Sequence, residues 1–137
     1  MKDYQISRFC WLEFNMDNLR DNFLVLKKMV GPDVKIMPAI KVNAYSHGIV
    51  ACGKVLEECG ADYLGVGSID EGILLRENGV NMPILIFASN LIQETANLYV
   101  QYHLIPTILS LEAARSFSEA VSEPSDVFIK IDTGRGR

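Results

Sequence analysis

The chain has 137 residues, of which 49% are hydrophobic and 22% charged, and this composition predicts a globular domain rather than a disordered segment. Its formal net charge of −4 argues against a nucleic-acid-binding protein and against one drawn to an anionic membrane. No apolar run approaches the roughly 20 residues of a membrane-spanning helix, and three cysteines without a C-x-x-C spacing predict reduced thiols in a cytoplasmic protein, not a disulfide framework or a metal site.

The first predicted elements are a short strand and a helix. Residues 9–14 form an apolar stretch around Trp11, the only tryptophan, and are compatible with a strand. Four apolar residues at helical spacing come next, namely Leu19, Phe23, Leu26 and Val30. Asn15 or Asp17 is suited to cap the start of this helix, and Gly-Pro at 31–32 predicts its end.

Apolar runs then alternate with helical patterns along the rest of the chain. The runs predict strands at 36–41, 63–66, 84–87, 105–109 and 127–131. The helical patterns between them span 47–58, a segment that closes before Gly79, 91–102 and 111–121. Two helices follow capping pairs, Ser68 with Glu71 and Asn90 with Gln93. The alternation predicts a parallel α/β sheet covered by helices, and units of about 20 to 26 residues suit a barrel or a doubly wound sheet.

Lys41 occupies a position where a lysine needs an explanation. It ends the apolar run of the first strand of this alternation, and a lysine is costly to bury there unless it is paired or used in chemistry. At the carboxyl end of a parallel strand it would face an active-site crevice, where a desolvated lysine can act as a Schiff-base nucleophile. Spacing alone leaves a solvated lysine at a strand end as the alternative.

The sequence around Lys41 resembles a known motif. From Lys41 to Gly48 the chain keeps the frame K-x-N-A-Y-x-H-G, which is similar to the cofactor-lysine motif A-V-V-K-A-N-A-Y-G-H-G of the alanine racemase family. Three further segments are similar to family motifs: G-A-D at 60–62, D-E-G-I-L-L-R at 70–76 and K-I-D-T-G-R-G-R at 130–137. The chain departs from the family pattern at Val42, Ser46 and Arg135, where the family usually has Ala, Gly and Met.

The resemblance implies a fold-type III pyridoxal-phosphate enzyme. Its fold class is α/β, a (β/α)₈ TIM-type barrel followed by a β domain, and such a barrel takes about 250 residues. Residues 1–137 are then a partial pyridoxal-phosphate-binding barrel domain, the first half, with four βα units and a fifth strand. In the family the N-terminal strand pairs into the β domain, which implies that residues 9–14 pair with that missing domain. The family works as a head-to-tail homodimer.

The implied function is interconversion of L- and D-alanine with pyridoxal 5′-phosphate as cofactor, which supplies D-alanine for peptidoglycan in the cytoplasm. A serine or broad-specificity racemase stays open, as does a barrel-type amino-acid decarboxylase. A non-catalytic pyridoxal-phosphate-binding half barrel is the alternative from another class. We expect the isolated chain, as a fragment with one of the two bases that racemisation needs, to be inactive.

By the resemblance, Lys41 attaches the cofactor and is the base on one face of the substrate, and Tyr45 binds the cofactor phosphate. Arg137 contacts the substrate carboxylate, and a carbamylated Lys130 orients Arg137. The alternative, purely structural roles are an aromatic residue of the core for Tyr45 and a surface ion pair with Asp132 for Lys130. The resemblance implies a small amino acid as substrate, with no metal, nucleic acid or membrane segment.

Overall fold

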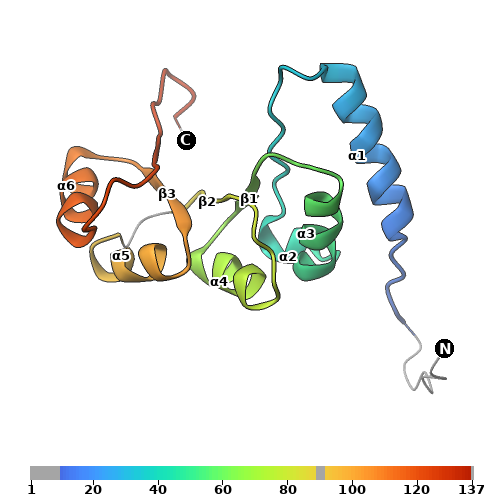
Figure 1. Ribbon diagram of the computed structural model, residues 1–137, viewed down its shortest axis with the longest axis horizontal. Coiled ribbons are helices and arrows are strands. Elements are labelled where there is room, and N and C mark those ends of the chain that lie inside the picture. Colours follow the sequence, from blue (N-terminus) through green and yellow to red (C-terminus); the bar gives the residue numbers. More distant parts are fainter. Residues whose placement is uncertain (1–9, 89–91, 137) are drawn as a thin grey trace.

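The computed structural model describes residues 10–88 and 92–136, and Figure 1 shows how its elements follow one another. The helices are α1 (Met16–Val30), α2 (Lys41–Tyr45), α3 (Ile49–Glu58), α4 (Ile69–Glu77), α5 (Ile92–Gln101) and α6 (Leu111–Ala120). The strands are β1 (Leu64–Val66), β2 (Ile84–Ile86), β3 (Leu104–Ile108) and β4 (Phe128–Ile129). The predicted alternation of strands and helices is confirmed from β1 onward.

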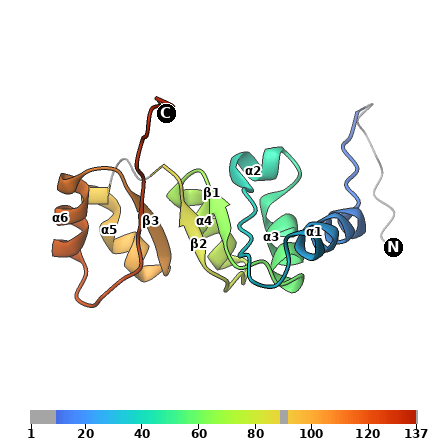
Figure 2. The same ribbon diagram turned by 90° about the horizontal axis from the view of Figure 1, so that it is seen from above.

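The four strands form one parallel sheet in the order β1-β2-β3-β4, so each strand lies beside the next one along the chain. Helices α3 to α6 lie around one side of this row of strands in Figure 1, and Figure 2 shows the same order from above. A doubly wound sheet would reverse its strand order part-way, whereas a barrel keeps it sequential. The sheet is therefore part of an α/β barrel.

Close packing distinguishes the two faces of this sheet. A Cβ atom on Gly72 of α4 would lie 2.9 Å from the Ile86 side chain and 3.0 Å from that of Leu104, so these two strand residues face the helices. Side chains alternate along a strand, and Gly65 points to the opposite, inner face. There a Cβ atom would come within 2.2 Å of the Phe87 ring. Small residues thus let the helices approach the outer face and let Phe87 cover the inner one.

Several helix ends follow the sequence predictions. The side chains of Asn15 and Ser110 accept backbone N–H groups in the first turns of α1 and α6, and Gly60 follows α3 with a φ of 74°, as a glycine after a helix end commonly does. Asn90 and the side chain of Gln93 lie outside the described residues, so their pairing stays a prediction.

The strand predicted at 36–41 is reduced to one bridge, in which Ala39 pairs with Gly65. Pro38 contributes its carbonyl to this contact, accepting from the Gly65 N–H at 2.9 Å, but it has no N–H of its own to extend the ladder. At Lys41 the chain leaves the extended conformation and enters α2. The segment nevertheless runs beside β1 and carries Lys41 to the carboxyl end of the sheet.

Residues 10–14 form no strand within this chain. Trp11 is 59% exposed, and its indole N–H donates to the Glu13 carboxylate at 2.8 Å. The sheet of the described residues does not include this stretch. Pairing of residues 9–14 with a further β domain stays a prediction.

Arg76 ties together two loops at the amino end of the sheet. Its Nη1 donates to the carbonyl oxygens of Val80 and Met82, both at 2.8 Å. Its Nε and Nη2 donate to the carbonyl oxygens of Tyr102 and His103, both at 2.9 Å. Burial lowers the pKa of Arg76, but an arginine stays charged at any physiological pH. One guanidinium therefore connects the chain before β2 to the chain before β3.

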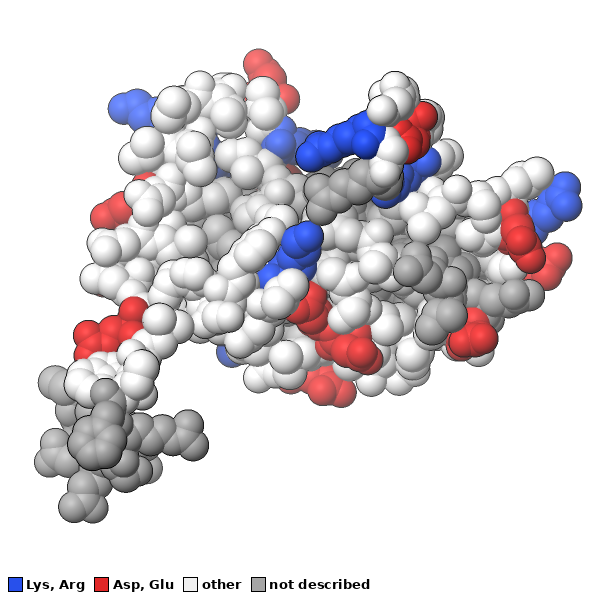
Figure 3. Space-filling view, turned by 180° about the vertical axis from the view of Figure 1, so that it is seen from behind, with Lys and Arg blue, Asp and Glu red and all other residues white. Residues whose placement is uncertain are grey.

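Large apolar side chains are exposed at the two ends of the row of elements. On α1 they are Leu24, Val25, Leu26, Met29 and Val30, and around β4 they are Val127, Phe128, Ile129 and Ile131. The predicted stripe on α1 is thus buried mainly at Phe23, because α1 packs against α3 on one side only. Figure 3 shows broad areas without a charged side chain. No helix within the described ranges is long and apolar enough to cross a membrane.

We expect the 137-residue chain, expressed by itself, to self-associate, because exposed apolar surfaces at an open sheet edge favour contact between copies. Replacing Met29 and Ile131, exposed by 76% and 77%, with lysine should raise the concentration needed for association about tenfold. Val100→Lys on α5 is the matched control and should change little. Sedimentation velocity over a concentration series measures this, and a monomer throughout the series with cooperative thermal unfolding contradicts it.

Candidate active site

The carboxyl ends of the parallel strands meet at one edge of the sheet, which we call the carboxyl edge. The residues that directly follow the extended segments there are Lys41, Gly67, Phe87, Leu109 and Lys130. Active sites of α/β barrels lie at this edge. The structure therefore brings Lys41 and Lys130 to the same side of the fold, with Tyr45 in the turn after Lys41. Arg137 lies outside the described residues.

Lys41 opens a turn with left-handed backbone geometry. All five residues from Val42 to Ser46 have positive φ, from 52° at Tyr45 to 72° at Ser46. None of them is glycine, and a left-handed conformation costs an ordinary residue about 1–2 kcal/mol. The left-handed conformation is least suitable for Val42, because a β-branched side chain tolerates positive φ poorly. The lysine is therefore followed by a conformation that other contacts must stabilise.

Hydrogen bonds close this turn from within. The Ala44 N–H donates to the Ile40 carbonyl at 2.8 Å, and the Gly48 N–H donates to the Asn43 carbonyl at 3.1 Å. The Asn43 side-chain oxygen accepts the N–H of Ile49, the first residue of α3, at 2.9 Å. Asparagine suits this place because it tolerates left-handed geometry better than most residues and caps helices well.

The His47 side chain also closes the turn that follows Lys41. Its Nδ1 lies 2.8 Å from the carbonyl oxygens of both Ala44 and Tyr45, so Nδ1 must carry the hydrogen and donate it. The Phe14 ring packs edge-on against the imidazole, with 4.0 Å between the centroids. His47 thus ties two carbonyl groups of the turn together through one ring nitrogen.

Glu71 joins the turn to the neighbouring strand. The predicted capping box is half right: the Ser68 hydroxyl accepts the Glu71 N–H at 3.4 Å, but the Glu71 carboxylate does not return the bond to Ser68. Its Oε1 accepts the Asn43 N–H at 2.9 Å, and its Oε2 accepts the Gly67 N–H at 2.8 Å. This carboxylate bridges the two backbone segments that flank Lys41.

Gly67 leaves the room that this arrangement needs. A Cβ atom there would lie 3.3 Å from the Glu71 carboxylate and 3.4 Å from the Lys41 Cβ atom. Such distances are at or below ordinary van der Waals contact, so a side chain at 67 would press on both neighbours. The absence of a side chain lets the lysine stem and the carboxylate lie against the end of β1.

Tyr45 is 55% exposed, so the alternative prediction that it is an aromatic residue of the core is wrong for this structure. Together with His47 and Phe14 it lines an apolar cavity of about 360 Å³ between α1, α3 and the segment before Lys41. Its hydroxyl therefore belongs to an accessible side chain in the turn that starts at Lys41.

Lys130 continues β4, because its N–H donates to the Ile108 carbonyl at 3.0 Å. The Phe128 ring packs edge-on against Tyr63 on the inner face of the sheet, with 5.8 Å between the centroids. Strand alternation puts Lys130 on the same face as Phe128, whereas Ile129 lies on the other. The backbone thus directs Lys130 toward the inner side.

The tail after β4 is organised by Asp132. One of its carboxylate oxygens accepts the N–H groups of Gly134 at 2.9 Å and Gly136 at 3.2 Å. Both glycines have positive φ, 119° and 68°. The side chain of Asp132 thus folds the loop that leads to residue 137.

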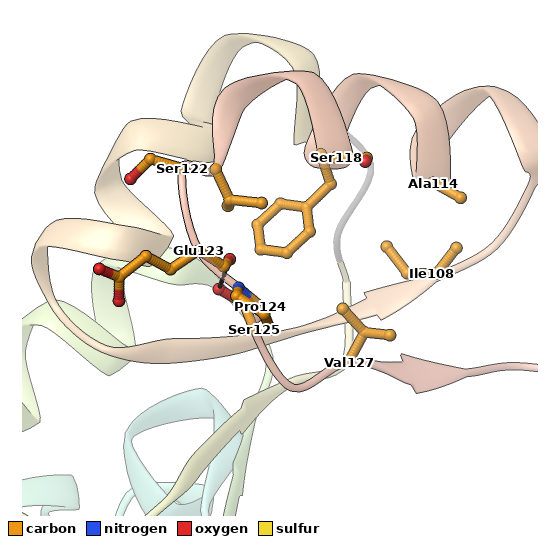
Figure 4. Close-up of a pocket in the computed structure, with 10 residues that line it drawn as sticks. Ile108, Ala114, Ser118, Ser122, Glu123, Pro124, Ser125 and Val127 are labelled. Atoms are coloured by element: carbon orange, nitrogen blue, oxygen red, sulfur yellow. Dashed lines mark hydrogen bonds between the residues drawn. The ribbon is translucent and has the colours of Figure 1, made fainter.

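A second cavity, of about 400 Å³, lies between β3, α6 and the loop that follows α6 (Figure 4). Ile108, Ala114 and Val127 form its apolar wall, and Glu123 is the charged residue in its lining. Ile108 faces the helices, so this cavity opens on the outer side of the sheet and is not part of the lysine site. Within residues 10–88 and 92–136 no cluster of His, Cys, Asp or Glu is suited to hold a metal.

Residues 14–137 match the family model described as alanine racemase, N-terminal domain. The chain belongs to this family. Alanine racemase of Halothermothrix orenii is 37% identical over 136 residues, which are 97% of this chain and 36% of that protein. Alanine racemase of Carboxydothermus hydrogenoformans is 38% identical over 93% of this chain and 35% of that protein. The chain thus spans about a third of the length of these curated relatives.

Solved structures agree with this family membership. Alanine racemase of Clostridium difficile 630, in complex with cycloserine, superposes with a TM-score of 0.90 at 38% identity, over 97% of this chain and 37% of that one. A histidine racemase of Leuconostoc mesenteroides has a TM-score of 0.78 at 24% identity, which shows a shared fold only. The fold is therefore the partial barrel of an alanine racemase N-terminal domain.

Sequence reasoning missed Glu71 and Gly67 as neighbours of the lysine. Glu71 has the spacing of a capping box, so the local pattern assigned its carboxylate to Ser68. Gly67 has a φ in the ordinary range and carries no turn signal of its own. The D-E-G segment of the family was the one available signal for Glu71, and it did not specify a partner.

We expect Val42→Asn to stabilise the protein by about 0.5–1 kcal/mol, because Val42 is 66% exposed and strained at a φ of 55°, whereas asparagine tolerates this region. Val34→Asn is the matched control: Val34 is 52% exposed but does not have positive φ, so no gain is expected there. Thermal unfolding of the complete protein measures both. Equal effects of the two substitutions would show that backbone strain at 42 is not relieved.

Proposed function

We propose that this chain is the part of a pyridoxal-phosphate-dependent racemase that carries the cofactor lysine, and that the complete protein interconverts L- and D-alanine. The observation that carries this proposal is Lys41, at the carboxyl edge of a partial barrel and followed by a fixed turn, in a chain of the alanine racemase family. The curated relatives are named alanine racemases. The chain spans about a third of their length, so the activity is proposed for the complete protein.

The residues present fit pyridoxal 5′-phosphate. Lys41 offers a primary amine for the cofactor aldehyde, and it lies beside Gly67, where no side chain fills the space. Tyr45, four residues after Lys41, is an accessible side chain whose hydroxyl could bind the cofactor phosphate. The bound cofactor would supply the electron sink that stabilises negative charge at the substrate α-carbon.

The chain's own residues would then orient substrate and move a proton. Racemisation needs a base on each face of the α-carbon, and we assign the Lys41 amine to one face. We assign Arg137 to the substrate carboxylate, since it follows the loop that Asp132 folds. The second base is expected from the rest of a protein of the relatives' length.

In the cell, we propose that the complete enzyme supplies D-alanine for peptidoglycan synthesis, that it does so in the cytoplasm, and that it works as a homodimer. Whether the complete enzyme also uses serine or other amino acids is tested by offering each amino acid separately in a racemisation assay. A non-catalytic half barrel would bind cofactor without turnover.

We expect Lys41→Ala to lower racemisation by about a thousandfold or more in both directions, because cofactor attachment and one base are lost together. Borohydride reduction and peptide mapping of the complete protein should place the pyridoxyl group on Lys41. Lys35→Ala is the matched control, because Lys35 lies 5.7 Å from the Tyr63 ring, at the far end of the segment that leads to Lys41. Label on Lys35, Lys54 or Lys130 instead contradicts the assignment.

We also propose that Lys130 is carbamylated and positions Arg137. Lys130 is on the inner side of β4, as Phe128 is. A positively charged lysine beside a guanidinium repels it, whereas a carbamate gives a charge-assisted pair. That pair would hold the guanidinium where the substrate carboxylate arrives.

Lys130→Ala in the complete enzyme should lower activity about tenfold or more, and added acetate should restore part of it by supplying the lost negative charge. Lys54→Ala, at an exposed position of α3, is the control: it should keep wild-type activity, and added acetate should not change that activity. Undiminished activity of the Lys130 variant eliminates the carbamate role. Activity that is lost but not rescued by acetate favours a structural role for the lysine stem.

A further inference from the structure

We propose that Glu71 is a positioning residue for Lys41, which acts by fixing the left-handed turn against the end of β1. The inference rests on the proposed role of Lys41 as the cofactor lysine. It concerns a carboxylate that would touch neither cofactor nor substrate but that holds the backbone on both sides of the lysine. We call Glu71 and the two amides it binds, those of Asn43 and Gly67, the clasp.

The geometry of the clasp is specific to a carboxylate. Asn43 is two residues after Lys41, and Gly67 lies against the Lys41 Cβ atom. Each amide donates to a different oxygen of Glu71, at 2.9 Å and 2.8 Å. An ionised carboxylate only accepts hydrogen bonds, so it satisfies both donors, whereas a glutamine offers one acceptor and turns an NH₂ group toward the other amide. Hydrogen bonds to a charged partner are also the stronger ones.

The clasp is built on a rigid element. Glu71 is in the first turn of α4, whose start is capped by Ser68. The next residue, Gly72, lies so close to Ile86 that a Cβ atom would be 2.9 Å away. At the other end Arg76 bonds to the loops before β2 and β3. Functional groups are placed most accurately when their support is rigid, and α4 is held at its start, middle and end.

The turn needs this support because its packing is weak. Of the residues with left-handed geometry, Ala44 is buried, whereas Val42 and Tyr45 are 66% and 55% exposed. Burial therefore offsets little of the backbone strain. The Glu71 bond to the Asn43 amide joins the turn to the sheet, and without it the turn can relax toward negative φ. Such a change would redirect the Lys41 stem, since Lys41 is the residue where the turn begins.

Glu57 provides a matched control within the same chain. Its Oε1 accepts the N–H groups of Asn81 and Met82 at 2.8 Å and 2.7 Å. It too is a helical carboxylate that bonds to two backbone amides, but it holds the loop before β2, at the opposite edge of the sheet from Lys41. Both of its bonds go to one oxygen, which a glutamine would keep, so the control that removes them is Glu57→Ala. A general loss of stability should follow from either Glu57→Ala or Glu71→Gln, whereas a loss of lysine positioning should follow from the second alone.

The experiment compares the complete wild-type protein with Glu71→Gln, Glu71→Asp and Glu57→Ala. One readout is hydrogen exchange of the peptides that contain 41–48 and 79–83. The other is the pyridoxal 5′-phosphate concentration that half-saturates borohydride-trapped label on Lys41. For Glu71→Gln we expect faster exchange at 41–48 and a half-saturating concentration raised about tenfold or more, as the loss of a charge-assisted bond implies. For Glu57→Ala, which removes the acceptor of both amides, we expect faster exchange at 79–83 and labelling as in wild type.

Glu71→Asp covers the case in which the glutamine variant does not fold. Aspartate keeps the charge but is one methylene shorter, so it can bond to only one of the two amides and should also raise the half-saturating concentration. Wild-type labelling in a folded Glu71 variant overturns the inference, and so does an equal rise of the half-saturating concentration in Glu57→Ala. If wild-type Lys41 takes no label at all, the proposed function fails, and unchanged exchange at 41–48 in the Glu71 variants then overturns the clasp separately.

Discussion

The fold depends on charged side chains at both ends of α4 that bond to backbone rather than to other charges. At its carboxyl end, the Arg76 guanidinium donates to four carbonyl oxygens in two loops. At its amino end, the Glu71 carboxylate accepts hydrogen bonds from two backbone N–H groups. Both groups bond to backbone that is partly buried or exposed and that lies outside the strands. Because α4 packs on β1 and β2, these bonds set where both edges of the sheet lie relative to one helix.

Local chemistry explains which parts of the fold were predictable. The strands from β1 onward, the caps at Asn15 and Ser110, and the glycine after α3 follow from apolar runs and capping preferences that act over a few residues. The left-handed turn could not be read in this way, since Val42 favours extended structure. The ladder at 36–41 was overestimated because apolar character was weighed above the missing N–H of Pro38.

The placement of the candidate residues was predictable, whereas the hydrogen bonds that connect them to the fold were not. Motif resemblance singled out Lys41, Tyr45 and Lys130, and the structure brings them to one edge of the sheet because parallel strands end together there. The carboxylate of Glu71, by contrast, bonds to a residue 28 positions away in the sequence. A capping pattern describes bonds within one helix turn, so it carries no information about a partner at that separation.

The imidazole of His47 bears on which side chains the turn accepts at this position. Its Nδ1 donates to the carbonyl oxygens of Ala44 and Tyr45, and its ring lies edge-on against Phe14. Asparagine offers an N–H donor but no ring, and phenylalanine offers a ring but no N–H donor. The histidine that follows the lysine is thus used for its shape and its N–H group together, and no other side chain of similar size combines the two.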